Sequence, residues 1–144
     1  MAVERTLAII KPDAVQKGII GEVISRIDSA GLKIVGIKML QLTKERAEGF
    51  YAVHKGKSFF GDLVGFMTSA PVVVMTLEGD NAISTWRQTM GTTDPEQAPE
   101  GSIRRDYGAN IQNNVVHGSD APATAQFETS YFFDDGEFVS YDWN

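Results

Sequence analysis

Apolar and polar positions along this chain follow periods that change from segment to segment, and these periods predict its elements. Thr6 followed by four apolar residues, over residues 6–10, predicts a buried strand that ends at Lys11. Apolar residues at i, i+3, i+4 and i+7 predict an amphipathic helix over residues 20–30, which Gly31 ends. Period-two alternation then predicts a half-buried strand whose apolar positions are Val35, Ile37 and Met39.

The rest of the chain continues this mixture of helices and strands. Thr43 is the expected cap of a helix that runs to about residue 53, and further helical patterns cover residues 59–67, 81–90 and about 122–133. Strands are expected at residues 71–77 and 115–116, and the tail over 138–141 is β-prone. The order of elements predicts a sheet covered by helices, of the α+β or α/β class.

One long stretch, residues 91–114, has weak helix and strand signals. A loop of this length within a compact domain is usually functional.

Bulk composition narrows the class of protein. A chain of 144 residues is expected to form one domain, residues 1–144. The net charge of −6 argues against broad nucleic-acid binding, although it leaves room for a small cationic pocket. Without cysteine there are no disulfides, thiol catalysis or Cys-ligated metals. The first residues lack the apolar core of a signal peptide, and the apolar run at 71–75 is too short to span a bilayer. We expect a cytoplasmic protein.

The segment 114–120, NVVHGSD, carries the strongest candidate chemistry. His117 is one of only two histidines, and it follows two valines that favour a strand. Gly118, Ser119 and Asp120 are turn and cap residues. A histidine at such a strand-to-helix corner can be held rigidly and still be reached from solvent, which suits a nucleophile. A packed core histidine is the alternative.

Cations and donors for phosphate chemistry occur elsewhere in the chain. The cationic candidates are Lys11, Arg87 and Arg104, and the neutral donors are Thr93 and Asn114. Taken singly, each basic residue has the alternative of being solvated surface. Glu128 falls on the last predicted helix, where a carboxylate could orient an imidazole.

Known phosphate-binding motifs of other kinds do not occur. The sequence has no Gly-x-x-x-x-Gly-Lys-Ser/Thr loop, no Gly-x-Gly-x-x-Gly fingerprint and no protein-kinase motif set. His54 and His117 also lack metal-site spacing. Any nucleotide site must therefore be of another type.

The segment 114–120 resembles the active-site signature of the nucleoside diphosphate kinases, and the resemblance extends over nearly the whole chain. Further matching segments are 5–14 (RTLAIIKPDA), 49–55 (GFYAVHK), 59–60, 65–67, 71–73, 90–91, 93–95 and 101–104. The resemblance implies an α+β fold, a ferredoxin-like antiparallel sheet with helices packed on one side.

The resemblance also implies roles for single residues. His117 matches the phosphorylated histidine, Glu128 the carboxylate that holds it, and Ser119 a supporting residue close by. Phe59 matches the aromatic that stacks on the base, and Ile111 an apolar residue near it. The residues that match phosphate or ribose ligands are Lys11, Tyr51, Arg87, Thr93, Arg104 and Asn114.

The implied reaction moves the γ-phosphoryl group of a nucleoside triphosphate to a nucleoside diphosphate in a ping-pong cycle. Mg²⁺ is expected between the phosphates rather than in a protein cage. The implied partners are nucleotides and other copies of the chain in a tetramer or hexamer, with no membrane or specific nucleic acid.

The sequence departs from the common pattern of the family at Ser58 and at Phe127 and Thr129, the neighbours of Glu128, among other positions. Two alternatives stay open: a binding protein without catalysis, and a phosphohistidine carrier charged by a protein.

Overall fold

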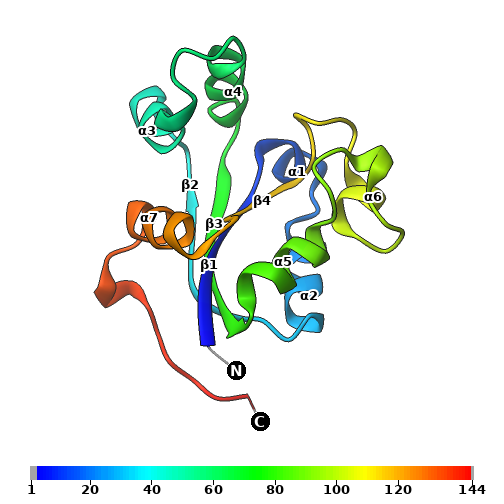
Figure 1. Cartoon of the computed structure of the whole chain (residues 1–144), viewed down its shortest axis with the longest axis vertical. Helices are drawn as coiled ribbons and strands as arrows, with labels where there is room; N and C mark the ends of the chain where they lie inside the picture. The colour runs from blue at the N-terminus through cyan, green and yellow to red at the C-terminus, as the bar shows by residue number, and fades with distance from the viewer. Residues whose placement is uncertain (1–2, 144) are drawn as a thin grey trace.

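Four antiparallel strands form the centre of the molecule in this computed structural model, which describes residues 3–143 (Figure 1). Their order in the sheet is β2-β3-β1-β4, and all three neighbouring pairs are antiparallel. The strands are β1 (Val3–Ile10), β2 (Lys33–Leu40), β3 (Val72–Asp80) and β4 (Val116–Gly118). The α+β class and the ferredoxin-like sheet expected from the sequence are confirmed.

Helices cover both faces of this sheet. Leu7 and Ile9 of β1 pack into one apolar cluster, whereas Ala8 and Ile10 pack into a second cluster on the opposite face. Figure 1 shows α7 on one side of the strands and α5 with α2 on the other. The expectation that helices lie on one side is therefore wrong in this detail. The helices are α1 (Pro12–Lys17), α2 (Ile20–Ser29), α3 (Lys44–Phe50), α4 (Phe60–Met67), α5 (Ala82–Met90), α6 (Ile103–Tyr107) and α7 (Pro122–Phe132).

Most predicted helices are present close to their predicted bounds. The Thr43 hydroxyl accepts a hydrogen bond from Arg46 N, which confirms it as the cap of α3. That helix ends at Phe50, however, and a short 3₁₀ helix, η1 (Ala52–His54), follows it. The Gly31 backbone has a φ of 81°, as expected for the residue after a helix.

The alternation in β2 predicts one buried face that holds Val35, Ile37 and Met39, and this prediction is wrong for the last two. Val35 is buried, but Ile37 and Met39 are 51% and 57% exposed. The pairing of β2 with β3 shifts register between Ile34 and Gly36. Such a bulge sends the following side chains to the other face, so the period in the sequence does not continue through it.

The stretch expected to be a long loop contains two short helices. They are η2 (Pro95–Gln97) and α6, and the Ser102 hydroxyl caps α6 by accepting from Arg105 N. Short caps and prolines organise these turns without the apolar period on which helix prediction depends.

The β-prone tail does not form a strand. It begins with η3 (Asp135–Glu137) and then follows β2, where Val139 N donates to Val35 O and the Tyr141 hydroxyl donates to Ile34 O. The bulge at this point of β2 limits regular pairing. The tail therefore covers its own domain, and Tyr141 and Trp143 remain partly exposed.

Within residues 3–143, no helix has the length and apolar character needed to cross a membrane.

Candidate active site

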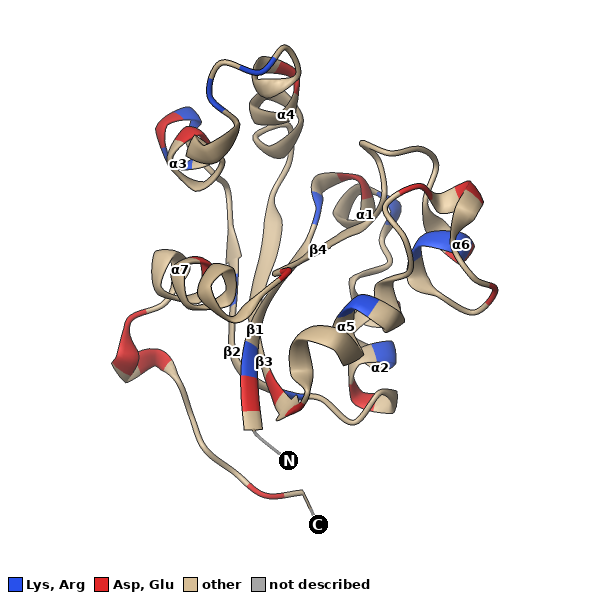
Figure 2. Ribbon diagram, viewed as in Figure 1, with Lys and Arg blue, Asp and Glu red and all other residues tan. Residues whose placement is uncertain are grey.

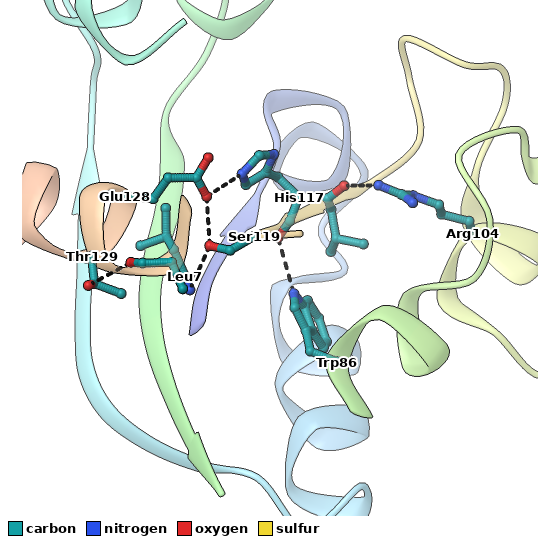
Figure 3. A network of polar contacts seen from close by, with 9 residues as sticks. Leu7, Trp86, Arg104, His117, Ser119, Glu128 and Thr129 are labelled. Atoms are coloured by element: carbon teal, nitrogen blue, oxygen red, sulfur yellow. Dashed lines mark hydrogen bonds and ion pairs between the residues drawn. The ribbon is translucent and has the colours of Figure 1, made fainter. Parts of the chain in front are cut away.

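His117 lies on β4, where its backbone pairs with Ile9 of the central strand β1. Its Nε2 lies 3.0 Å from Glu128 Oε1, and the Ser119 hydroxyl donates to the same oxygen at 2.7 Å (Figure 3). Because an ionised carboxylate only accepts hydrogen bonds, the pairing assigns the ring proton to Nε2. The lone pair of Nδ1 is then available to an electrophile. The predicted triad of His117, Ser119 and Glu128 is thus brought together.

Ser119 also joins this pair to the sheet. Its hydroxyl accepts from Leu7 N at 3.3 Å, while its own backbone N–H donates to Leu7 O at 3.3 Å. These bonds extend the pairing of β4 with β1 by one residue and fix the donor that faces Glu128.

Sequence reasoning missed the residue that holds the His117 backbone, Trp86 of α5. Its indole Nε1 donates to His117 O at 3.1 Å, and the side chain is fully buried (Figure 3). A Cβ at Gly118 would lie 2.6 Å from the indole Cδ1, so this close approach requires glycine. The spacing of Ile83, Trp86 and Met90 along α5 is the signal that could have placed this indole on the buried face.

Asn114, three residues before His117, is hydrogen-bonded to three of the predicted phosphate ligands, Lys11, Thr93 and Arg104. Lys11 Nζ donates to Asn114 Oδ1 at 2.6 Å, and Asn114 Nδ2 donates to Thr93 O at 3.0 Å. The Arg104 guanidinium donates to the carbonyl oxygens of Asn114, Gly91 and Val116, at 3.2, 3.0 and 2.7 Å respectively. The chain segments that precede His117 are therefore tied together by two buried cations.

Basic residues of α1 and α2 fix the helix that carries Arg104. Arg26 forms an ion pair with Asp106 at 2.7 Å and donates to Gly101 O, and Lys17 donates to Tyr107 O. These contacts secure both ends of α6. Because α6 is only five residues long, such outside contacts are what hold it in place.

A hollow of about 450 Å³ opens beside these groups and is lined by Arg87, Thr93 and Arg104, among others. Figure 2 shows blue segments on α5, on α6 and just before α1, whereas the segment after α7 is largely red. An acidic protein thus presents a local group of cations, for which the net charge of the sequence left room.

Three aromatic rings form a series between the core and the surface of the α3–α4 hairpin. Tyr51 stacks on His54 with centroids 6.4 Å apart, and His54 lies 5.3 Å from Phe59. Phe59 is 46% exposed and caps α4 instead of beginning it. The buried Tyr51 hydroxyl has no hydrogen-bond partner among the described residues. Sequence reasoning had not placed His54 between these two rings.

Ile111 lies apart from the phosphate ligands. It is 61% exposed and lines a separate hollow of about 400 Å³ together with Asp94 and Asn110. The loop that carries Ile111 contacts α4 through a long hydrogen bond of 3.5 Å, which Gln112 Nε2 donates to Asp62 O.

Burial shifts the ionisation of the buried site residues. The pKa of Lys11 falls to about 8, first because the ammonium is buried and second because of the Arg104 charge, while Asp13 opposes the shift. Burial and the charge of Arg87 lower the pKa of Arg104 to about 10. Burial, with a smaller contribution from Glu128, raises the pKa of Tyr51. Lys11 and Arg104 are thus two desolvated cations, and the buried Tyr51 phenol stays neutral.

An imidazole held by a carboxylate can accept a phosphoryl group on its unprotonated nitrogen, and Arg104, a cation bonded to the residue before it, can offset the charge of that group. The fold and this arrangement together indicate a phosphotransferase.

Comparison with known proteins identifies the family. The family model described as nucleoside diphosphate kinase matches residues 4–138. A nucleoside diphosphate kinase of Anaeromyxobacter sp. (strain K) is 57% identical over 143 residues, covering 99% of this chain and 97% of that protein. The chain belongs to the nucleoside diphosphate kinase family.

Solved structures agree with this assignment. The Aquifex aeolicus nucleoside diphosphate kinase, in an orthorhombic crystal form, has a TM-score of 0.94 at 44% identity, covering 96% of this chain and 100% of its own. A halophilic nucleoside diphosphate kinase from Halobacterium salinarum, in complex with CDP, has a TM-score of 0.95 at 43% identity, covering 99% and 95%.

Proposed function

We infer that this protein is a nucleoside diphosphate kinase, which transfers the γ-phosphoryl group of a nucleoside triphosphate, typically ATP, to a nucleoside diphosphate. The observation that carries this inference is the 3.0 Å contact between His117 Nε2 and Glu128 Oε1, together with Arg104, which lines the hollow and donates to the carbonyl of the preceding residue, Val116. Membership of the family supports the same reaction.

The proposed cycle has two half-reactions at one site. In the first, Nδ1 of His117 attacks the γ-phosphorus, an N–P bond forms, and the bond to the β–γ bridging oxygen breaks, so that the diphosphate leaves with the electron pair. In the second, a terminal oxygen of another diphosphate attacks the phosphohistidine and the N–P bond breaks, which regenerates the imidazole. The protein alternates between two forms, which gives ping-pong kinetics.

The surrounding groups have roles that follow from their chemistry. Lys11, Arg87 and Arg104 would offset charge on the transferring phosphoryl oxygens, and the burial of Lys11 and Arg104 strengthens the effect of these two. Tyr51, Thr93 and Asn114 would bind phosphates or ribose, and the unpartnered Tyr51 hydroxyl supports this proposal.

The base would be bound without reading its edges. The half-exposed ring of Phe59 offers a stacking surface to any base, and Ile111 would pack near it. Because every base has an apolar face, we expect weak discrimination among bases.

We also propose that Mg²⁺ takes part with the nucleotide phosphates. Among residues 3–143, no group of three or more His, Cys, Asp or Glu side chains is placed to hold a metal ion. The chemistry of the residues present therefore suits an ion that takes its ligands from phosphate and water, and it would neutralise charge on the β- and γ-oxygens.

Labelling with γ-³²P-ATP tests the proposed function. The wild type should form an acid-labile, alkali-stable phosphoprotein that passes its label to added GDP. His117→Ala should lose both label and transfer, whereas variants of the only other histidine, such as His54→Ala, should still be labelled. Transfer that persists in His117→Ala would refute the histidine route. A purified wild type that takes no label from ATP, but is labelled on His117 by a phosphorylated protein donor, would indicate the phosphohistidine carrier instead.

Assembly and location remain proposals. We propose that residues 1–144 form one domain, which assembles into a tetramer or hexamer, on the basis of the family and of the exposed side chains Ile37 and Met39 on the edge strand β2. Light scattering that shows a stable monomer at micromolar concentration would refute the assembly. The cytoplasmic location is tested by cell fractionation.

A further inference from the structure

The chain makes an unusual turn two residues before His117. Val115 has a φ of 76°, and Val116 N donates to Asn114 O across it at 2.8 Å. A bond from residue i+2 back to residue i around a positive φ is a γ-turn of the rare, strained form. For a β-branched residue such as valine, this backbone region is a genuine outlier. Sequence reasoning had placed Val115 in the strand, which is wrong.

The segment just after β1 satisfies both backbone polar groups of Val115. Its N–H donates to Asp13 Oδ2 at 3.1 Å, and its carbonyl accepts from Lys11 N at 2.8 Å. Val115 is fully buried and Asp13 is 8% exposed, so no bulk water replaces these bonds. A strained residue persists only where its surroundings determine its conformation, and here Asp13 is the side chain that does so.

Among the residues that the structure describes, the Asp13 side chain has no other hydrogen-bond partner that would explain its burial. Its Oδ1 is buried and unpartnered within residues 3–143. Burying a carboxylate that is only half satisfied opposes folding. The strained turn and the half-satisfied carboxylate are both unfavourable alone, and they lie together next to the proposed nucleophile.

We propose that Asp13 is a positioning residue for phosphoryl transfer: by accepting from Val115 N it holds the strained turn that sets His117 and Asn114 at their working positions. The proposal rests on the proposed role of His117. If the turn relaxed to an ordinary conformation, Val116 would shift at the start of β4, and the Nδ1 direction would shift with it. A small misplacement of reacting groups can reduce a rate by up to about 100-fold.

Two other roles for Asp13 are distinguishable from this one. Asp13 lies in the first turn of α1, where an acidic residue stabilises a helix, and that role would alter the unfolding temperature without altering the rate. Its charge also opposes the lowered pKa of Lys11, and that role would be lost equally in Asp13→Asn and Asp13→Ala.

A double-mutant cycle with Val115→Gly tests the proposal, because glycine adopts a positive φ without strain. The measurement is the single-turnover rate of His117 phosphorylation by saturating γ-³²P-ATP, with the thermal midpoint recorded alongside. We expect Asp13→Ala to slow the rate strongly, and Asp13→Asn, which keeps an acceptor, to stay close to wild type. In the Val115→Gly background, Asp13→Ala should slow the rate much less. Asp28→Ala, on the exposed surface of α2, is the matched control.

Equal losses from Asp13→Ala in the two backgrounds would overturn the proposal, and so would a wild-type rate in Asp13→Ala. An Asp13→Asn rate as low as that of Asp13→Ala would overturn it in favour of a charge effect on Lys11. If Asp13→Ala does not fold, the double variant with Val115→Gly is measured, and its failure to fold would also overturn the proposal. A wild type that takes no label on His117 would refute the proposed function instead.

Discussion

Glu128 contacts His117 through Nε2 and leaves the opposite ring nitrogen unbound by this carboxylate. The Oε1–Nε2 distance is 3.0 Å, and the same oxygen accepts from Ser119 at 2.7 Å. Attack on phosphorus by Nδ1 requires no proton to be removed, because that nitrogen already carries a lone pair. What attack requires is the correct tautomer, a fixed ring angle and support for the positive charge that grows on the ring.

The first prediction separates orientation from charge at Glu128. The Glu128→Gln side chain keeps an oxygen that can accept from Nε2 and Ser119 but loses the negative charge. We expect the barrier to phosphorylation to rise by about 1.5–3 kcal/mol, the range for a hydrogen bond to a charged group. Single-turnover labelling measures this directly. A wild-type rate would mean that the carboxylate is structural, and complete loss of labelling would mean a more direct chemical role.

The second prediction concerns Arg104. It donates to the carbonyls of Gly91, Asn114 and Val116, so it holds the turn before His117 as well as lining the hollow. Arg104→Ala should cost about 2–4 kcal/mol of transition-state stabilisation, judged from kcat/KM, as for other preorganised charge-stabilising groups.

A neighbouring arginine provides the matched control for Arg104. Arg105 is exposed and donates to Glu96 O at 2.8 Å. Because that contact lies away from the hollow, Arg105→Ala should change kcat/KM little. Equal effects of the two substitutions would contradict the assignment of Arg104 to the site.

Much of this structure follows from the sequence pattern. Continuous or periodic apolar residues predicted β1, α2 and β3, because these elements bury one or both faces in the core, and helices were also expected at α5 and α7. The resemblance to the family selected residues from segments far apart in the sequence, and the structure brings His117, Ser119 and Glu128 within hydrogen-bond distance.

Other features could not be predicted because tertiary contacts override the local signal. Two consecutive valines favour a strand, yet two hydrogen bonds hold the first of them in a γ-turn: Val115 N donates to the Asp13 carboxylate, and Lys11 N donates to Val115 O. The bulge at Ile34 reversed the exposed face of β2 without any mark in the apolar alternation. The contact of Trp86 with His117 O depends on the packing of α5 against β4, which no local pattern encodes.

The third prediction concerns base recognition. Phe59→Ala should weaken nucleotide use by about 1–3 kcal/mol, to a similar extent for purines and pyrimidines, because stacking is available to every base. Steady-state kcat/KM for ATP, GTP, CTP and UTP as donors measures this. Phe127→Ala removes an aromatic ring of similar exposure, 51% against 46%, from α7 and is the control. Strong selectivity of the wild type for one base would contradict the stacking model.

The fourth prediction follows from the lowered pKa of Lys11, about 8 in the folded protein against an ordinary 10.5. Below pH 8, both the folded and the unfolded chain carry this proton. Between pH 8 and 10.5 the folded protein has lost it while the unfolded chain retains it, so this group makes the free energy of unfolding rise with pH. The catalytic efficiency with nucleotides should instead fall with pH, because phosphate binding requires the charged ammonium.

We therefore expect kcat/KM, which reports the free enzyme, to fall as pH rises through about 8. With saturating nucleotide, kcat should fall only at a higher pH, because bound phosphates stabilise the ammonium. Lys11→Arg is the diagnostic variant, since a guanidinium stays charged throughout this range. Its activity will be lower because Lys11 Nζ fits Asn114 Oδ1 at 2.6 Å, but its profile should lose the fall near pH 8. An Lys11→Arg profile that keeps the same fall would assign the titration to another group, and the Lys17→Arg variant controls for an exposed lysine.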